Sequence, residues 1–263
     1  MVILMLKILL FLIIAAGLAA IALMIRARRE GTRQYEKYAR YTREVLAQNF
    51  DLKPCYVRNE FQLLKPWKAF GMFVNIADLK TGGKFKRVNA FESTLGFFMK
   101  MFTILFFPDY QYNVPIMSVD IIFMGGRRVF VIEIIDTAKI EDENIRAHYA
   151  QMRALKPKVA PLRQKLVTRW YKDIITDFSI HAQEDRSKDD VLFEIYQAYL
   201  AAYLDMVCAA QPLNEELSTT VQKSVKEYVD NLIGQGGPAV DVLVKLLGAE
   251  KQKEYVYTVM FGL

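Results

Sequence analysis

The chain has 263 residues, 53% of them hydrophobic, and a formal net charge of +6. This length suits one globular domain with an appendage, and the apolar content is enough to bury a core. Cys55 and Cys208 form no zinc-binding spacing and are expected to be reduced core thiols in a cytosolic setting. Only His148 and His181 could add metal ligands, so we expect no transition-metal site. The sequence also lacks a dinucleotide fingerprint and a phosphate loop.

Residues 1–25 are predicted to form a transmembrane anchor. Val2–Ile25 is apolar except for Lys7, and Ile8–Ile25 reaches the roughly 18 residues that a membrane span requires. A cleaved signal peptide is the alternative, because Ala20-Ile21-Ala22 offers a small-x-small site. We favour the anchor because apolar residues continue past that site. Four basic residues follow the apolar run, namely Arg26, Arg28, Arg29 and Arg33. By the positive-inside rule, they predict that the C-terminal domain lies in the cytoplasm.

Residues 26–58 are predicted to form a basic juxtamembrane helix and linker. Basic residues alternate with tyrosines here, as in Arg33, Tyr35, Lys37, Tyr38, Arg40, Tyr41 and Arg43. One interpretation is a helix lying on anionic lipid. The other is a solvated linker helix, and the sequence does not separate the two. Pro54 is expected to end the segment.

Residues 59–263 are predicted to form the folded domain, with strands first and helices after them. The Gly125-Gly126 pair joins two strand-like runs and is a hairpin signal. Expected strands are Met72–Ala77, Lys84–Glu92, Met101–Phe107, Ser118–Met124 and Arg127–Ile135. Beyond Asp136 we expect helices at Asp142–Leu155, Pro161–Phe178 (a helix or helix-loop), Val191–Ala210 and Glu215–Ile233, a charged loop at Glu184–Asp190, and a last helix from Pro238 to the end.

Asp120 is the residue on which the chemical interpretation depends. It stands alone in an otherwise apolar strand, and burying an isolated carboxylate is costly. A carboxyl group in such surroundings has a raised pKa and can hold a proton near neutral pH. The structural alternative is a carboxylate that pairs with an arginine or caps a backbone group.

Two separated stretches resemble the ferredoxin-dependent bilin reductases. The first is FFPDYQYNVPIMSVDII, with Phe107-Pro108, Tyr112, Val114-Pro115 and Asp120 at the matching positions. The second is similar to the closing helix of that family and comprises Leu246-Leu247-Gly248-Ala249-Glu250, Glu254-Tyr255-Val256 and Val259-Met260-Phe261. The resemblance extends from about Phe61 to Leu263.

The resemblance implies a three-layer α/β/α sandwich with a central antiparallel sheet. It implies reduction of a linear tetrapyrrole such as biliverdin, a step of phytobilin biosynthesis, by single electrons from ferredoxin. The enzyme would have no cofactor of its own. Asp120 would be the catalytic proton donor. We expect the pocket to lie between the sheet face that bears Asp120 and the helices from Val191 onward.

The resemblance also suggests substrate-binding residues. Thr103 occupies a position where the family usually has His or Asn, and it would donate a hydrogen bond. Tyr112 and Met117 are expected wall residues. Cations that could meet the propionates of the pigment are Lys84, Lys86 and Arg87, with Arg127 and Arg128 as competitors. The alternative is a solvated strand face.

The chain departs from the family where members commonly carry a second Asp or Asn, at the start of the last helix. Gly236 or Gly237 stands there, unless Asp241 one turn later substitutes. This departure favours a second hypothesis, a catalytically silent carrier or sensor of tetrapyrroles at the membrane. A reductase acting on a chlorophyll-breakdown tetrapyrrole is a third. On the neighbouring strand, Glu133 and Asp136 are expected on opposite faces, with Asp136 structural.

The net charge bears on the expected partners. A basic surface would steer a small acidic ferredoxin towards the domain. It would attract nucleic acid equally, but no helix-turn-helix, zinc or RNA-binding fingerprint is present. We therefore expect a tetrapyrrole, ferredoxin and a membrane as partners, and no nucleic acid.

Overall fold

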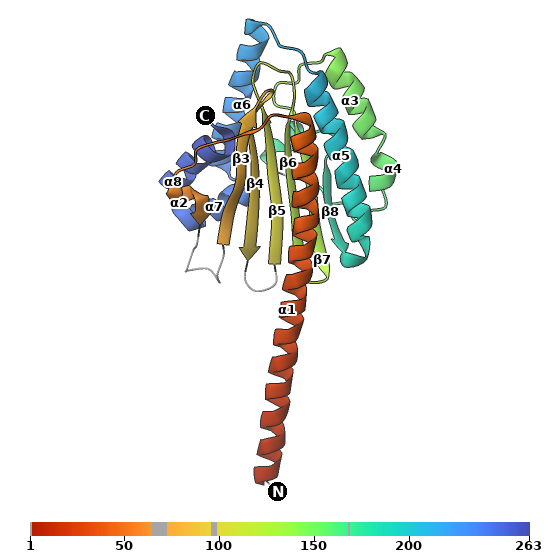
Figure 1. The fold of residues 1–263 in the computed structure, drawn as a ribbon, viewed down its shortest axis with the longest axis vertical. Coiled ribbons are helices and arrows are strands. Elements are labelled where there is room, and N and C mark those ends of the chain that lie inside the picture. Colours follow the sequence, from red (N-terminus) through yellow and green to blue (C-terminus); the bar gives the residue numbers. More distant parts are fainter. Residues whose placement is uncertain (1, 65–72, 96–98, 168) are drawn as a thin grey trace.

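The computed structural model describes residues 2–64, 73–95, 99–167 and 169–263. Its centre is one antiparallel sheet with helices on both faces, which confirms the expected α/β/α sandwich (Figure 1). The strand order is β1-β3-β4-β5-β6-β7-β8, with β2 paired to β3. The strands are β1 Lys53–Pro54, β2 Leu63–Leu64, β3 Phe73–Gly82, β4 Phe85–Leu95, β5 Met99–Pro108, β6 Ile116–Met124, β7 Arg127–Ile135 and β8 Ile180–Asp185.

The predicted central strands and their Gly125-Gly126 hairpin are confirmed. Expected residue Met72 lies outside the described residues. One helical layer comprises α1 Val2–Asn49, α3 Glu143–Arg153 and α5 Asp189–Ala209, with the short α4 Lys156–Val159 beside it. The other comprises α2 Asn59–Gln62, α6 Glu215–Gln235, α7 Pro238–Leu247, α8 Ala249–Glu254 and a π-helical segment, Tyr255–Phe261.

The pleat of β6 divides its side chains between the two layers. Because successive residues of a strand point to opposite faces, the odd-numbered residues enter the core beneath α5. These are Met117, Val119, Ile121 and Phe123. The even-numbered residues, Ser118, Asp120, Ile122 and Met124, point to the other side. We call the two sides the α5 face and the Asp120 face.

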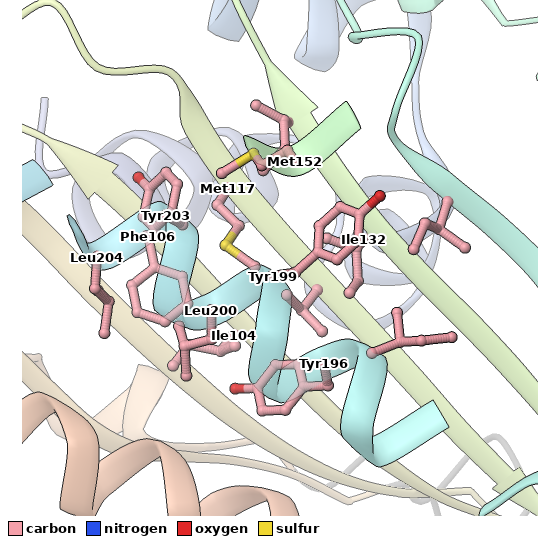
Figure 2. Close-up of a cluster of buried hydrophobic side chains, with 14 of the residues drawn as sticks. Ile104, Phe106, Met117, Ile132, Met152, Tyr196, Tyr199, Leu200, Tyr203 and Leu204 are labelled. Carbon is pink, nitrogen blue, oxygen red and sulfur yellow. The ribbon is translucent and has the colours of Figure 1, made fainter. Parts of the chain in front are cut away.

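Helix α5 buries tyrosines against the α5 face, where they pack with Phe106 and Met117 (Figure 2). Buried hydroxyl groups need hydrogen-bond partners. Tyr199 donates to the carbonyl of Phe178 at 2.8 Å, and Tyr203 donates to that of Pro115 at 2.9 Å. The tyrosines of this helix are therefore core residues.

Helix α1 continues without interruption to Asn49, and its second half packs into the domain. Its buried residues, Gly31, Gln34, Tyr35, Tyr38, Ala39, Thr42 and Leu46, follow helical spacing. Thr42 Oγ1 lies 2.5 Å from the Tyr196 hydroxyl of α5. The apolar side of this half completes the core, a role that neither sequence interpretation included. The folded domain thus begins within α1, before the expected boundary at residue 59.

The first half of α1 is exposed along its apolar length, with Ile3 73% and Ile25 48% exposed. It is long and apolar enough to cross a membrane, a property that signal sequences share. The segment Arg186–Ala209 passes the same test of length and composition, but more than half of it is buried, so it is a core helix.

The second half of the chain differs from expectation at four places. The charged loop expected at Glu184–Asp190 contains the end of β8, an edge strand whose outward residues are polar. The only helical segment among the described residues of Pro161–Phe178 is a short 3-10 turn, Trp170–Asp173. The expected last helix is divided at Gly248, where φ is +78° and favours glycine. Cys208, expected in the core, is exposed.

Arg128 joins α1, β7 and α5 at one end of the sheet. Its side chain is only 1% exposed, and its Nη2 donates to Glu30 Oε1 at 2.6 Å. Its Nε donates to Asp189 Oδ1 at 2.6 Å and its Nη2 to Oδ2 at 2.8 Å. Nη1 donates to the carbonyls of Gly125 and Arg127. One buried guanidinium therefore links three elements.

We expect Arg128→Leu to lower the free energy of unfolding by about 3–5 kcal/mol, because it leaves two partly buried carboxylates without their cation. Chemical denaturation measures this loss. Lys226→Ala, which breaks an exposed ion pair with Asp230 within α6, is the control and should cost no more than about 1 kcal/mol. Equal effects of the two substitutions would contradict the linking role of Arg128.

Candidate functional site

A row of paired residues crosses the sheet at the level of Asp120. The register pairs Phe91 with Thr103, Thr103 with Asp120, Asp120 with Val131, and Val131 with His181. Paired residues of neighbouring strands point to the same face. The row therefore presents two titratable side chains, Asp120 and His181, on the Asp120 face.

Asp120 has one recorded side-chain partner, Thr103, whose Oγ1 donates to Asp120 Oδ1 at 2.5 Å. Among the described residues, no Lys or Arg forms an ion pair with Asp120, so the arginine-paired alternative does not hold there. Burial raises the pKa of Asp120 from 3.8 to about 6. The Thr103 hydrogen bond opposes that rise, the negative charge of Glu133 adds to it, and His181 opposes it.

Glu133 and His181 form a second polar group beside Asp120. His181 Nε2 lies 3.2 Å from Glu133 Oε1, and both side chains are less than a fifth exposed. Tyr171 and Tyr228 lie near this pair, and burial followed by the charge of Glu133 raises the pKa of both tyrosines. Sequence reasoning missed Tyr171, Tyr228 and His181. The alternation His181–Gln183–Asp185 was the signal that could have placed His181 on a strand.

Three expected substrate-binding residues lie on the α5 side of the sheet, so their assignment beside Asp120 was wrong. Met117 is fully buried in the core beneath α5. Its odd separation from Asp120 requires opposite faces. Tyr112 packs against the same core. Lys84 donates to the carbonyls of Cys208 and Ala210 at the end of α5, both at 2.6 Å.

The other expected cations lie away from Asp120 along the strands. Arg87 precedes Phe91 by four residues, about 13 Å along β4, and its Nη2 donates to the carbonyl of Thr258 at 3.3 Å. Arg127 precedes Val131 by four residues, at the opposite end of the Asp120 face, and is exposed. Lys86 Nζ lies 4.4 Å from the centre of the Tyr110 ring.

Of the helices from Val191 onward that were expected to form the pocket wall, the first, α5, covers the face opposite to Asp120, so this part of the expectation was wrong. The Asp120 face is instead covered by α6, α7 and the π-helical segment, through residues such as Val229, Leu243 and Phe261. A cavity of about 280 Å³ lies on the α5 face, between α1 and residues including Val88 and Ile104. It belongs to the side of the sheet away from Asp120.

The residues expected near a second acid are engaged elsewhere. Asp241 is exposed, and its Oδ1 accepts from the Gly237 amide at 3.2 Å. Its Oδ2 lies 3.9 Å from Arg169 Nη1.

Asp136 accepts from the Tyr149 hydroxyl at 2.7 Å and from the Lys139 amide at 2.8 Å, as suits a structural residue.

Comparisons with known proteins show the family to which the chain belongs. The model of the ferredoxin-dependent bilin reductase family matches residues 39–262, so the chain belongs to that family. This match includes the end of α1, residues 39–49, which packs in the core.

Individual relatives are distant. The chain is 20% identical over 164 residues to phycoerythrobilin:ferredoxin oxidoreductase of Prochlorococcus marinus, covering 59% of this chain and 63% of that protein. It is 23% identical over 168 residues to 15,16-dihydrobiliverdin:ferredoxin oxidoreductase of Nostoc punctiforme, covering 62% and 68%. The crystal structure of tomato phytochromobilin synthase in complex with biliverdin shares the fold, with a TM-score of 0.71 and 14% identity over 87% of this chain and 83% of that one.

The charges around Asp120 lead to a first prediction for the site. Glu133→Gln should lower the pKa of Asp120, because it removes a negative charge that raises it. His181→Gln should raise that pKa, because it removes a positive influence. Carbon-13 NMR titration of the Asp120 carboxyl group measures both shifts. Two shifts of the same sign would contradict this electrostatic arrangement.

A second prediction concerns the pH dependence of stability. Because the folded-state pKa of Asp120 is raised above 3.8, folded chains hold a proton between about pH 4 and 6 that unfolded chains release. The free energy of unfolding therefore falls as the pH rises through this window. Asp120→Asn removes that fall. The variant should be more stable by about 1–3 kcal/mol at neutral pH and above, since one pKa unit corresponds to about 1.4 kcal/mol.

Denaturant unfolding of both proteins across the pH range measures the difference. The advantage of Asp120→Asn should shrink towards zero as the pH falls below 3.8. A difference that stays constant with pH would show that the pKa of Asp120 is not raised by folding.

Proposed function

We propose that this protein reduces a linear tetrapyrrole such as biliverdin with single electrons from ferredoxin, and that Asp120 donates a proton to the pigment. Membership of the ferredoxin-dependent bilin reductase family supports the class of reaction. The observation that carries the assignment of Asp120 is its partly buried position on a largely apolar strand, where desolvation raises its pKa to about 6. An acid of this strength holds enough protons near neutral pH to donate them, and its carboxylate can be reprotonated by water.

Reducing one double bond takes two electrons, one from each of two ferredoxin molecules, and two protons. Asp120 supplies one proton to the pigment and regains it from solvent. Thr103, its hydrogen-bond partner, cannot titrate near neutrality. We assign the second proton to His181, which lies in the same cross-strand row and contacts Glu133. Glu133 would hold the imidazole in place through this contact.

The propionates of the pigment would meet cations on the Asp120 face. Of the expected cations, Arg87 lies on this face, and its side chain is held in place by its hydrogen bond to the Thr258 carbonyl. The net charge of +6 supports steering of an acidic ferredoxin. The basic residues after Ile25 support a single-pass anchor with the domain in the cytoplasm.

A second candidate function is a membrane-tethered carrier or sensor that binds a tetrapyrrole without reducing it. The glycines at positions 236 and 237 favour it, because the family commonly has an acid there and Asp241 is engaged with Gly237 and Arg169. The two functions differ in one observable. A carrier forms a coloured complex whose absorbance does not change when reduced ferredoxin is supplied.

The experiment is anaerobic turnover of biliverdin by the full chain with reduced ferredoxin, followed by absorbance. We expect the rate to fall as the pH rises through about 6, because Asp120 must be protonated to donate. Asp120→Asn should retain pigment binding but lose activity by about 10²–10⁴-fold, the usual contribution of a positioned acid. Thr103→Val should shift the falling limb to higher pH, because the Thr103 hydrogen bond lowers the pKa of Asp120.

Asp205→Asn, an exposed carboxylate on α5, is the matched control and should leave turnover unchanged. Normal turnover by Asp120→Asn would remove Asp120 from the reaction. A stable bound spectrum in the parent protein, with no bleaching or shift, would establish the carrier instead.

A further inference from the structure

The lower part of the Asp120 face, from Asp120 towards the β6–β7 turn, carries a partly exposed apolar strip. It consists of Met99 and Met101 of β5, Ile122 and Met124 of β6, and Val129 of β7. None of these five residues packs in either buried core. An exposed apolar strip beside a polar site marks a surface that meets an apolar partner.

The apolar half of α1 is joined rigidly to this end of the domain. The helix is unbroken from Val2 to Asn49, so no linker allows the domain to swivel. Glu30 is held by the buried guanidinium of Arg128. At Gly31 the helix approaches the sheet closely, since a Cβ placed there would lie 3.2 Å from the Lys100 Cβ and 3.5 Å from that of Phe123.

The level of the membrane surface follows from that contact. Ile25, the last apolar residue, precedes Gly31 by six residues, or about 9 Å along the helix. On the sheet, Gly126 follows Phe123 by three residues, or about 10 Å. Helix α1 leaves the domain at this end of the sheet and runs nearly along the strands (Figure 1). The β6–β7 turn therefore lies level with the end of the apolar run.

The exposed residues level with the β6–β7 turn include several arginines, which suit an anionic surface. Arg26, Arg28 and Arg29 of α1 are exposed. Arg127 and Arg186 are exposed beside the β6–β7 turn, where the amide of Arg186 donates to the Gly126 carbonyl. Clusters of basic residues next to a membrane span bind anionic headgroups.

We propose that the β6–β7 edge of the domain rests on an anionic phospholipid bilayer and that the apolar strip opens at the lipid interface. Together with the proposed function, on which this last step rests, the interface is the route by which the tetrapyrrole, with its largely apolar rings, reaches Asp120. The unbroken helix and the Arg128 contacts hold the domain in this orientation.

The test uses the full chain with Cys55 and Cys208 replaced by serine and one new cysteine that carries a fluorophore. Gly126→Cys places the label at the proposed contact, where a side chain meets no neighbouring atom within 4 Å. Gln111→Cys places it at the opposite end of β6, about 30 Å away, and is the matched control. The protein is reconstituted in vesicles of phosphatidylcholine and phosphatidylglycerol that contain lipids with a nitroxide near the headgroup.

We expect quenching at position 126 to exceed that at position 111 several-fold. A flexible glycine-serine insertion after Ile25 should reduce this difference, and so should vesicles of phosphatidylcholine alone. The same insertion should slow the uptake of biliverdin from preloaded vesicles. Equal quenching at the two positions would overturn the proposal. So would a mass measurement showing that the purified protein has lost the apolar N-terminal segment.

Quenching does not depend on catalysis. A protein that shows the expected quenching but no turnover leaves this orientation standing and contradicts only the reductase. A protein that shows turnover but no preferential quenching at position 126 supports the reductase and contradicts this orientation.

Discussion

The alternation of side chains along β6 is the constraint on which the rest of the molecule depends. One face of the strand must supply the core beneath α5, so its odd-numbered residues are large and apolar. The other face is then free to carry Asp120, and the antiparallel register places Thr103 and His181 in the same row. A shift of one residue would exchange the two faces, sending the carboxylate into the core and Val119 or Ile121 into the site. The site and the core are therefore specified by the same pairing.

The same register explains how one acid can be both buried and usable. The sheet and the helices on the Asp120 face keep water from the carboxyl group, which raises its pKa, while Thr103 holds one of its oxygens in a defined position. Glu133 and His181 act on it from the neighbouring strands with opposite effects. Thr103 has no group that titrates near neutral pH, and positions 236 and 237 are glycines. The carboxyl and imidazole groups of this site belong to Asp120, Glu133 and His181, which all lie on the sheet.

Helix α1 is both an apolar segment and part of the folded domain. A helix that joins an apolar segment to a soluble domain commonly ends at the membrane surface, and a loop then decouples the two. Here the helix continues and supplies Tyr35, Tyr38 and Leu46 to the core. The contacts of Arg128 then tie its junction to β7 and α5. Removing the docked half would expose the apolar face of the sheet, so this half of α1 is part of the fold.

The sequence by itself determined the local features: the apolar N-terminal run, the β5–β7 strands with their glycine hairpin, the long helices, and Asp120 as a lone acid in an apolar strand. Their signals are periodicity and composition over neighbouring residues, which need no knowledge of the rest of the chain. The separation of Met117 from Asp120 was also readable, because an odd spacing on a strand means opposite faces. Only the tertiary structure decided which helices cover which face, that half of α1 belongs to the core, and that His181, Glu133 and Tyr171 gather beside Asp120. These depend on strand order and on contacts between residues far apart in the chain, such as Arg128 with Glu30, and a single sequence carries no local signal for such pairings.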